Sequence, residues 1–262
     1  IYCITICGNS AMQHLFLGLP PDNLGRTPFA SVIKSHVAVK ARDLNLNINP
    51  RGIVHFLPLI GGFVGADTTA VLLSLPHNTH KMKLIIDLGT NGELVLGNRE
   101  KMLAASTAAG PALEGAGIKF GMRGTNGAIE RVHLSKGKIE LKVIMEEKPL
   151  GLCGSGLIDA IAEMLKAGII DERGRLLNKE AYLTKCRPEY AALADNLEKI
   201  DNLNVFVLVG EGESQNGNKI YISQKDVRAV QLAKGAIYTG CMLLLREYGL
   251  RGTRYAWLCM IV

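Results

Sequence analysis

The residues best suited to chemistry follow an apolar strand that ends at Asp87. Gly89, Thr90, Asn91 and Gly92 form the turn after it, and a second apolar strand returns from there. An Asp at the end of a buried strand is costly unless it is paired, hydrogen-bonded or close to a metal ion. The glycines would let backbone N–H groups approach an anion, and Thr90 adds a hydroxyl donor. This pattern indicates phosphate binding with Asp87 ordering Mg²⁺ through water, or else an ordinary Asn-Gly hairpin turn.

A second Gly-rich turn, with the sequence GLCGSG, leads into a helix predicted at 155–167. Helix N-termini bind anions through their free N–H groups, and Gly154, Ser155 and Gly156 would leave room for a nucleotide there. The alternative is a structural turn capped by Ser155. Cys153 is more readily explained as a small buried residue than as a nucleophile, because no His lies near it in sequence.

Three charged residues occur in other segments rich in small residues. Pro111 predicts a first helical turn close to another backbone, and Glu114 behind it is either a solvated cap or a site acid. Arg123, in the next Gly-rich loop, could reach a phosphate, although an ion pair with Glu114 is favoured. Asp67 lies near the start of a helix predicted at 64–75, where an acid is favourable without any function.

Composition excludes several classes of protein. The 262 residues are 48% hydrophobic and 21% charged, which is enough apolar material for a core and excludes long-range disorder. The net charge of +6 is diffuse, so we expect no nucleic-acid binding. The most apolar stretch, 52–75, is broken by polar residues, Pro and Gly, so we expect no membrane span. The six cysteines form no C-x-x-C pair, which predicts free thiols, with Cys3 and Cys7 buried, in a reducing cytoplasmic setting.

The elements that would position these residues are mixed. The predicted strands cover residues 1–7, 53–60, 83–87, 93–96, 128–134, 138–144, 205–209 and 219–222. The predicted helices open near Ser10 and cover 64–75, 155–167 and 223–248. The last helix has the strongest signals, because Ser223 is a good N-cap, Asp226 completes a capping box and Gly249 ends it. Strands mixed with helices predict an α/β fold.

Seven segments in the same order resemble the C-terminal domain of the ASKHA-type reductive activators of corrinoid proteins, the RACo-like family. The resemblance spans nearly the whole chain, roughly residues 1–250. The matching segments are GNSAMQHLFLGL (8–19), LPLIGGFVGADTTA (57–70), IDLGTNGELVLG (86–97), STAAGPALEGA (106–116), GMRGTNGAI (121–129), GLCGSGLIDA (151–160) and QLAKGAIYTG (231–240).

The resemblance implies an actin/Hsp70/sugar-kinase-like fold with an ATP cleft between two RNase-H-like halves. Residues 1–80 would be the remainder of the first half and 81–262 the second, incomplete at both ends. By similarity, Asp87, Gly89, Thr90 and Asn91 match the second phosphate loop, while Gly154, Ser155 and Gly156 would line the nucleotide side of the cleft. These site residues would hold ATP and Mg²⁺.

The family also implies a function for the whole protein. In full-length relatives, a [2Fe–2S] domain delivers an electron, and ATP binding and hydrolysis help reduce a Co(II) corrinoid protein to Co(I). The cysteine cluster of that domain and the first phosphate loop are absent from this sequence. Residues 254–262 do not resemble the family, so we expect a truncation or a reading-frame artefact there. We therefore expect the fragment alone to be inactive. The oligomeric state stays open, a homodimer included.

Two alternatives belong to other classes. A small-molecule kinase of the same fold would need a catalytic Asp beside a hydroxyl acceptor, and Asp67 is the obvious candidate. A non-catalytic scaffold that binds a partner would have lost its nucleotide site.

Overall fold

The computed structural model describes residues 1–76 and 79–250 together with the backbone of 259–261. Contacts within it divide the chain into two compact units. The first unit consists of Ile1–Leu88, Gly92–Thr107 and Thr239–Val262, and the second consists of Gly89–Asn91 and Ala108–Tyr238.

This division differs from the one at residue 80 that the sequence predicted. The strands between residues 83 and 107 belong to the first unit, although they follow the predicted boundary. The assignment of two RNase-H-like halves to 1–80 and 81–262 therefore stays a prediction. Residues 254–258 and 262 of the unusual tail lie outside the described residues.

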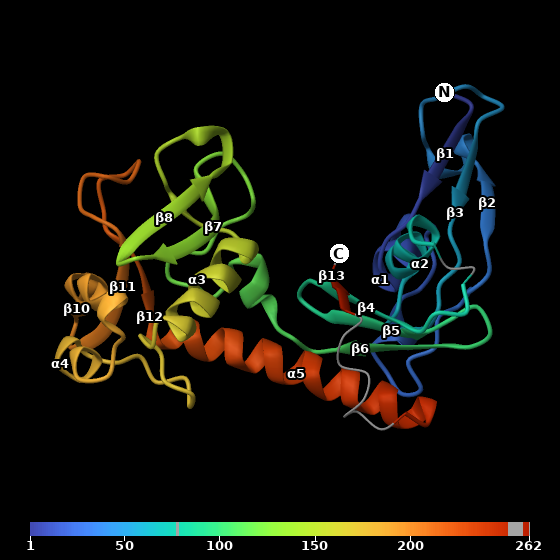
Figure 1. Cartoon of the computed structure of the whole chain (residues 1–262). Coiled ribbons are helices and arrows are strands. Elements are labelled where there is room, and N and C mark those ends of the chain that lie inside the picture. The colour runs from blue at the N-terminus through green and yellow to red at the C-terminus, as the bar shows by residue number, and fades with distance from the viewer. Residues whose placement is uncertain (77–78, 251–258, 262) are drawn as a thin grey trace. The chain divides into compact units, whose positions relative to one another are not determined.

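The first unit holds two sheets (Figure 1). In one, β3 lies between a parallel β1 and an antiparallel β2. Its strands are β1 (Cys3–Ile6), β2 (Val37–Lys40) and β3 (Ile53–Phe56). In the other, with the order β13-β4-β5-β6, neighbours are antiparallel except that β13 is parallel to β4. Its strands are β4 (Lys83–Leu88), β5 (Gly92–Gly97), β6 (Met102–Thr107) and β13 (Cys259–Ile261).

The helices of the first unit begin where the sequence predicted. They are α1 (Ser10–Phe16) and α2 (Ala66–Ser74), with the short 3-10 helices η1 (Asp22–Leu24) and η2 (Ala41–Leu44). The side chain of Asn9 caps α1 by accepting a hydrogen bond from the N–H of Met12. Cys3 and Cys7 are exposed, which corrects the prediction of buried thiols, because they occupy the solvent face of β1 and its extension.

The second unit also holds two sheets. Its first sheet contains β7 (Ala128–Ser135), β8 (Lys138–Val143) and β9 (Gly151–Leu152), and its second contains β10 (Leu197–Ile200), β11 (Leu203–Val209) and β12 (Ile220–Ser223). Its helices are α3 (Gly154–Lys166) and α4 (Lys179–Leu183), with the 3-10 helices η3 (Pro111–Glu114), η4 (Ile144–Glu146) and η5 (Pro188–Asn196). β7 packs on α3 (Figure 1). Leu134, Leu157 and Met164 are fully buried in the core around them.

The long helix α5 (Gln224–Tyr248) confirms the sequence signals at both ends. The Ser223 hydroxyl donates to the Asp226 carboxylate at 2.6 Å, and the N–H of Ser223 donates to the same oxygen at 2.8 Å. Gly249 follows the helix with a φ of 86°, which suits a glycine at a helix C-terminus. Among the helices in the described part of the chain, none has the length and apolar character needed to cross a bilayer.

Candidate functional site

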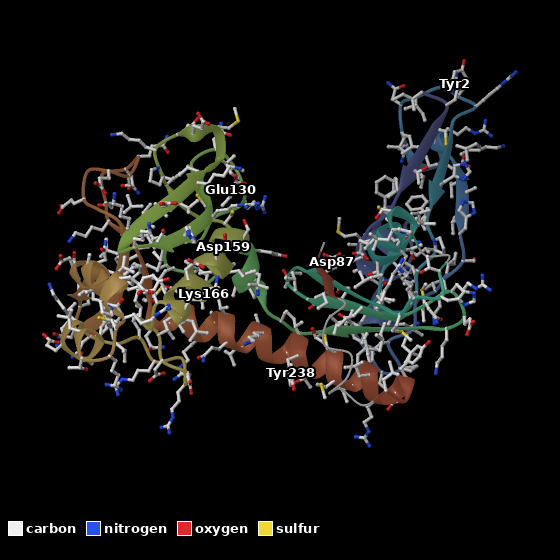
Figure 2. All side chains as sticks on the ribbon, in the orientation of Figure 1. Tyr2, Asp87, Glu130, Asp159, Lys166 and Tyr238 are labelled. Atoms are coloured by element: carbon white, nitrogen blue, oxygen red, sulfur yellow. The ribbon has the colours of Figure 1, made fainter. Side chains whose placement is uncertain are left out.

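Asp87, which is labelled in Figure 2, is the second-last residue of β4, and its partner across the hairpin is another acid. Asp87 lies directly opposite Glu93 on the antiparallel strand β5. Burial raises the pKa of the Asp87 carboxyl, and the charge of Asp67 raises it further. Burial also raises the pKa of Glu93, against a hydrogen bond from Ser106, and both Asp67 and Asp87 add to that rise. Like charges at opposite positions in a sheet are destabilising, and none of the ion pairs of the described residues involves Asp87 or Glu93.

Asp67 completes this group, which we call the acid cluster (Asp67, Asp87 and Glu93). It lies in the first turn of α2, where its Oδ1 accepts the N–H of Thr68 at 2.8 Å. The predicted position near the helix start is confirmed, and an acid there is favourable without any function. Glu93 was not among the predicted site residues, although the hairpin places it opposite Asp87.

The acid cluster has the donor chemistry of a site for a hard cation. Mg²⁺ prefers oxygen ligands, keeps several waters and is commonly held by one or two carboxylates together with substrate phosphates. No group of three or more His, Cys, Asp or Glu side chains in the described residues is arranged to hold a metal by itself. The cluster therefore does not fit a site made wholly of protein ligands, and Mg²⁺ held by Asp87 through water stays a prediction.

The turn after Asp87 differs from the predicted Asn-Gly hairpin turn. Leu88 pairs with Gly92, so the hairpin is confirmed but its loop has three residues, Gly89 to Asn91. The N–H of Gly89 donates to the carbonyl oxygen of Asn91 at 3.0 Å. Asn91 has no positive φ, whereas a two-residue Asn-Gly turn of type I′ needs one.

Glu114 binds this turn through both of its carboxylate oxygens. Oε1 accepts the backbone N–H of Thr90 at 2.7 Å, and Oε2 accepts the Thr90 hydroxyl at 2.7 Å. A Cβ on Gly89 would lie 3.2 Å from Glu114 Oε1, so the missing side chain of Gly89 leaves room for the carboxylate. The Thr90 hydroxyl, which the sequence predicted as a phosphate donor, therefore holds a carboxylate of the same unit together with the Thr90 N–H.

Glu114 also lines an open hollow of about 320 Å³ in the second unit. Arg123, Gly124 and Gly154 share the lining with it. The predicted ion pair between Glu114 and Arg123 is absent from the ion pairs of the described residues, because the Glu114 carboxylate is held by Thr90 instead. The exposed Arg123 guanidinium therefore lies beside Glu114 without neutralising it.

The N-terminus of α3 meets the same hollow at Gly154. Cys153 is its N-cap residue and forms no side-chain cap, which corrects the expectation that Ser155 caps the helix. The first N–H groups of a helix have no partner inside the helix, so donors remain available here. Cys153 is buried, and its thiol donates to the carbonyl oxygen of Ile129 at 3.4 Å, which confirms a structural role.

Close packing against neighbouring backbone explains why residues 154 and 156 at this terminus are glycines. A Cβ on Gly154 would collide with the carbonyl oxygen of Leu113, and one on Gly156 would collide with that of Ile129. The backbones of η3 and α3 thus approach closely, as Pro111 and the small residues predicted. A nucleotide role for Gly154, Ser155 and Gly156 stays a prediction.

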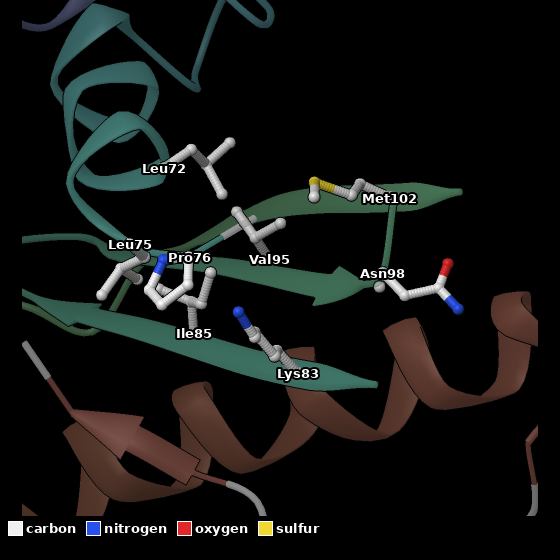
Figure 3. A pocket seen from close by; sticks show the side chains of 9 residues that line it. Leu72, Leu75, Pro76, Lys83, Ile85, Val95, Asn98 and Met102 are labelled. Carbon is white, nitrogen blue, oxygen red and sulfur yellow. The ribbon is translucent and has the colours of Figure 1, made fainter. Parts of the chain in front are cut away.

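A hollow in the first unit is too small to be a ligand site. It is lined by apolar side chains such as Leu72, Ile85 and Met102, with Lys83 reaching in from β4 (Figure 3). Its volume is about 10 Å³, close to the least that holds one water.

Comparison with known proteins identifies the family to which this chain is similar. A model of the C-terminal domain of RACo, the ASKHA domain, matches residues 81–260, and a model of the RACo middle region matches residues 1–79. The corrinoid activation enzyme RamQ of Eubacterium limosum is 52% identical over 253 residues, which cover 97% of this chain and 42% of that protein. The Co(II) methylated amine-specific corrinoid protein reductase of Methanosarcina barkeri is 28% identical over 217 residues, which cover 74% of this chain and 34% of that protein.

A solved structure agrees with these relatives. The structure of a reductive activator for corrinoid,iron-sulfur protein matches with a TM-score of 0.83 and 34% identity, over 96% of this chain and 39% of that one. The chain thus spans less than half the length of each of these proteins. The predicted ASKHA fold is confirmed, and the chain belongs to the RACo family, of which it carries the middle region and the C-terminal ASKHA domain.

Proposed function

We propose that this chain is the ATP-binding and ATP-hydrolysing part of a reductive activator that drives a corrinoid protein from Co(II) to Co(I). The names of two relatives, a corrinoid activation enzyme and a Co(II) corrinoid protein reductase, support this reaction. The solved structure of a reductive activator for a corrinoid protein supports it as well. The partner in this proposal is a corrinoid protein, not a nucleic acid or a membrane.

The observation that carries the proposal is the pair of donors at Thr90. Its N–H and hydroxyl both hold the Glu114 carboxylate at 2.7 Å, so their geometry suits the oxygens of an anionic group. In the proposal, phosphate oxygens of ATP take these donors, with Gly89, Asn91 and Gly92 shaping the turn. The N-terminus of α3, which meets the hollow at Gly154, and Arg123 offer further positive charge there.

Asp87 would hold Mg²⁺ through water and orient the water that attacks the terminal phosphate. Its raised pKa and its position opposite Glu93 support this role, because a cation there would relieve repulsion between carboxylates. Mg²⁺ supplies neutralisation of the charge that develops on the phosphate oxygens. Positioning and charge neutralisation would therefore provide most of the catalysis.

The electron would come from a [2Fe–2S] domain, which the family resemblance implies for the whole protein. The described residues offer no group of three or more metal-ligating side chains, so the cluster is not assigned to them. A reduced cluster in that domain would supply the one electron that takes Co(II) to Co(I), while ATP and water would give ADP and phosphate. The chain's own contribution is to couple the second reaction to the first.

The test uses the full-length protein, a Co(II) corrinoid protein, a reductant and Mg-ATP, with Co(I) followed by its absorbance. We expect Co(I) to form only with ATP, and Thr90→Ala to lose most of this dependence. Thr184→Ala removes another exposed hydroxyl of the second unit and should behave as the unchanged protein does.

Three results would contradict the proposal in different ways. Co(I) formation that ignores ATP would refute the coupling. ADP release that depends on a small hydroxyl acceptor would favour a kinase of the same fold. Absence of Mg-ATP binding in calorimetry, with the protein folded, would favour a scaffold that binds a partner without nucleotide.

A further inference from the structure

Glu114 and a bound phosphate would need the same two donors. Both oxygens of the carboxylate are engaged by Thr90, one by its N–H and one by its hydroxyl. An N–H and an O–H group can each donate one hydrogen, so a phosphate at the turn requires Glu114 to leave. This reasoning rests on the proposed function, in which the turn of Gly89 to Asn91 binds phosphate.

The surroundings of Glu114 allow it to leave. The residue is exposed, so its carboxylate is easily hydrated once released. It is the last residue of η3, and Gly115 follows with a φ of 84° as the helix ends. Arg123 lines the same hollow and forms no ion pair among the described residues, so a cation stands near the released carboxylate.

We propose that Glu114 is an internal competitor for the phosphate site and sets its selectivity. Its carboxylate imitates two oxygens of a phosphate, so the turn keeps its shape without ligand. A ligand must displace a carboxylate that already occupies both donors of Thr90. A phosphate group, with more charge and more oxygens, can do so, whereas carboxylates and other weak anions cannot. Glu114 would thereby tune affinity for ATP without touching the reacting atoms.

The experiment is a double-mutant cycle on the full-length protein, with Mg-ATP binding measured by calorimetry. The variants are Glu114→Gln, Thr90→Ala and the combination of both. Glu140→Gln, on the exposed face of β8, is the matched control because it removes an equal charge far along the chain from the turn. Circular dichroism and thermal unfolding of each variant establish that it is folded.

We expect Glu114→Gln to bind Mg-ATP more tightly, on the order of tenfold, because a charge-assisted competitor becomes a neutral one. Glu140→Gln should change affinity little. The gain should shrink when Thr90→Ala is also present, because that change removes the hydroxyl donor and keeps the backbone N–H donor. Acetate should weaken ATP binding more in Glu114→Gln than in the unchanged protein, because the vacated donors then accept a carboxylate.

Different results would contradict the competitor role of Glu114 and the proposed function. Weaker binding in Glu114→Gln would overturn the inference and leave the proposed function standing, since Glu114 would then assist the ligand. An equal gain with and without Thr90→Ala would also overturn it, because the effect would be general charge repulsion. If neither the unchanged protein nor Glu114→Gln binds Mg-ATP, the proposed function fails and the inference fails with it.

Discussion

Replacing Asp87 by Asn should stabilise the protein while it removes the proposed magnesium site. Asp87 and Glu93 lie directly opposite each other on β4 and β5, and Asp67 adds a third negative charge. Like charges at opposite strand positions are unfavourable by about 0.2–1 kcal/mol. With Asp67 included, we expect Asp87→Asn to raise the free energy of unfolding by about 1 kcal/mol at pH 7, or a few degrees in Tm.

The dependence on pH follows from the direction of the pKa shift. The pKa of Asp87 is raised above its ordinary value of 3.8, so the folded state binds the proton more tightly than the unfolded state does. Asp87 therefore adds to stability at low pH, and this contribution is lost as pH rises through its folded pKa. Asp87→Asn should remove that fall, so the difference from the unchanged protein should grow between acidic and neutral pH.

Magnesium should reverse the ranking of the two proteins. A cation that binds only the folded state raises its stability with concentration, so Mg²⁺ should stabilise the unchanged protein and leave Asp87→Asn nearly unaffected. The assay is thermal unfolding of the full-length protein from pH 4 to pH 8, with Mg²⁺ or with EDTA. Glu247→Gln, an exposed acid on α5 in the same unit, is the control. If Asp87→Asn is less stable than the unchanged protein at pH 7 in EDTA, the reasoning is wrong.

Three further changes test the second unit. Glu163→Gln should lower the free energy of unfolding by about 2 kcal/mol in urea denaturation at pH 7, because it weakens hydrogen bonds from Lys166 and from the N–H of Leu134. Burial opposes ionisation of Glu163, yet those bonds lower its pKa, so the loss should shrink as pH falls through that pKa. Asp226→Ala should lower the free energy of unfolding by about 3 kcal/mol in the same assay, because it leaves buried donors at the start of α5 without their acceptor. Asp226→Asn should lower it less. Gly154→Ala should lower Tm by several degrees, because its Cβ would collide with the neighbouring backbone, and an unchanged Tm would contradict that packing.

The elements predicted well are those whose signals are local. Ser223, Asp226 and Gly249 lie at the ends of α5, and each acts within a few residues of its own position. The turn from β7 to β8 is similar, because Lys136 and Gly137 both adopt a positive φ, as a two-residue hairpin requires. Alternating or continuous apolar residues were enough to place β4, β5 and β11.

The features that were missed depend on contacts distant in sequence. The loop of Gly89 to Asn91 is held by Glu114, which follows Thr90 by 24 positions, so the local Asn-Gly signal did not decide the turn. The predicted ion pair between Arg123 and Glu114 is absent for the same reason, because Thr90 holds the Glu114 carboxylate. The close approach of Gly154 to the backbone of Leu113 also joins segments distant in sequence, and it is a packing reason for glycine that is independent of any nucleotide. Types of residue at the site were thus readable, but their partners were not.

The charges around the turn suit a nucleotide that is bound to a cation better than they suit free nucleotide or free cation. The acid cluster holds carboxylates whose pKa values are raised by burial and by each other, so it favours a cation and disfavours an anion. The Thr90 donors hold a carboxylate, so they favour an anion. Asp87 precedes the turn with only Leu88 between them. Free ATP would bring its negative charge next to Asp87, and free Mg²⁺ would leave the Thr90 donors to Glu114. Because Asp87 and Thr90 are only three residues apart in the chain, a nucleotide that carries its own Mg²⁺ is the ligand we propose for this turn.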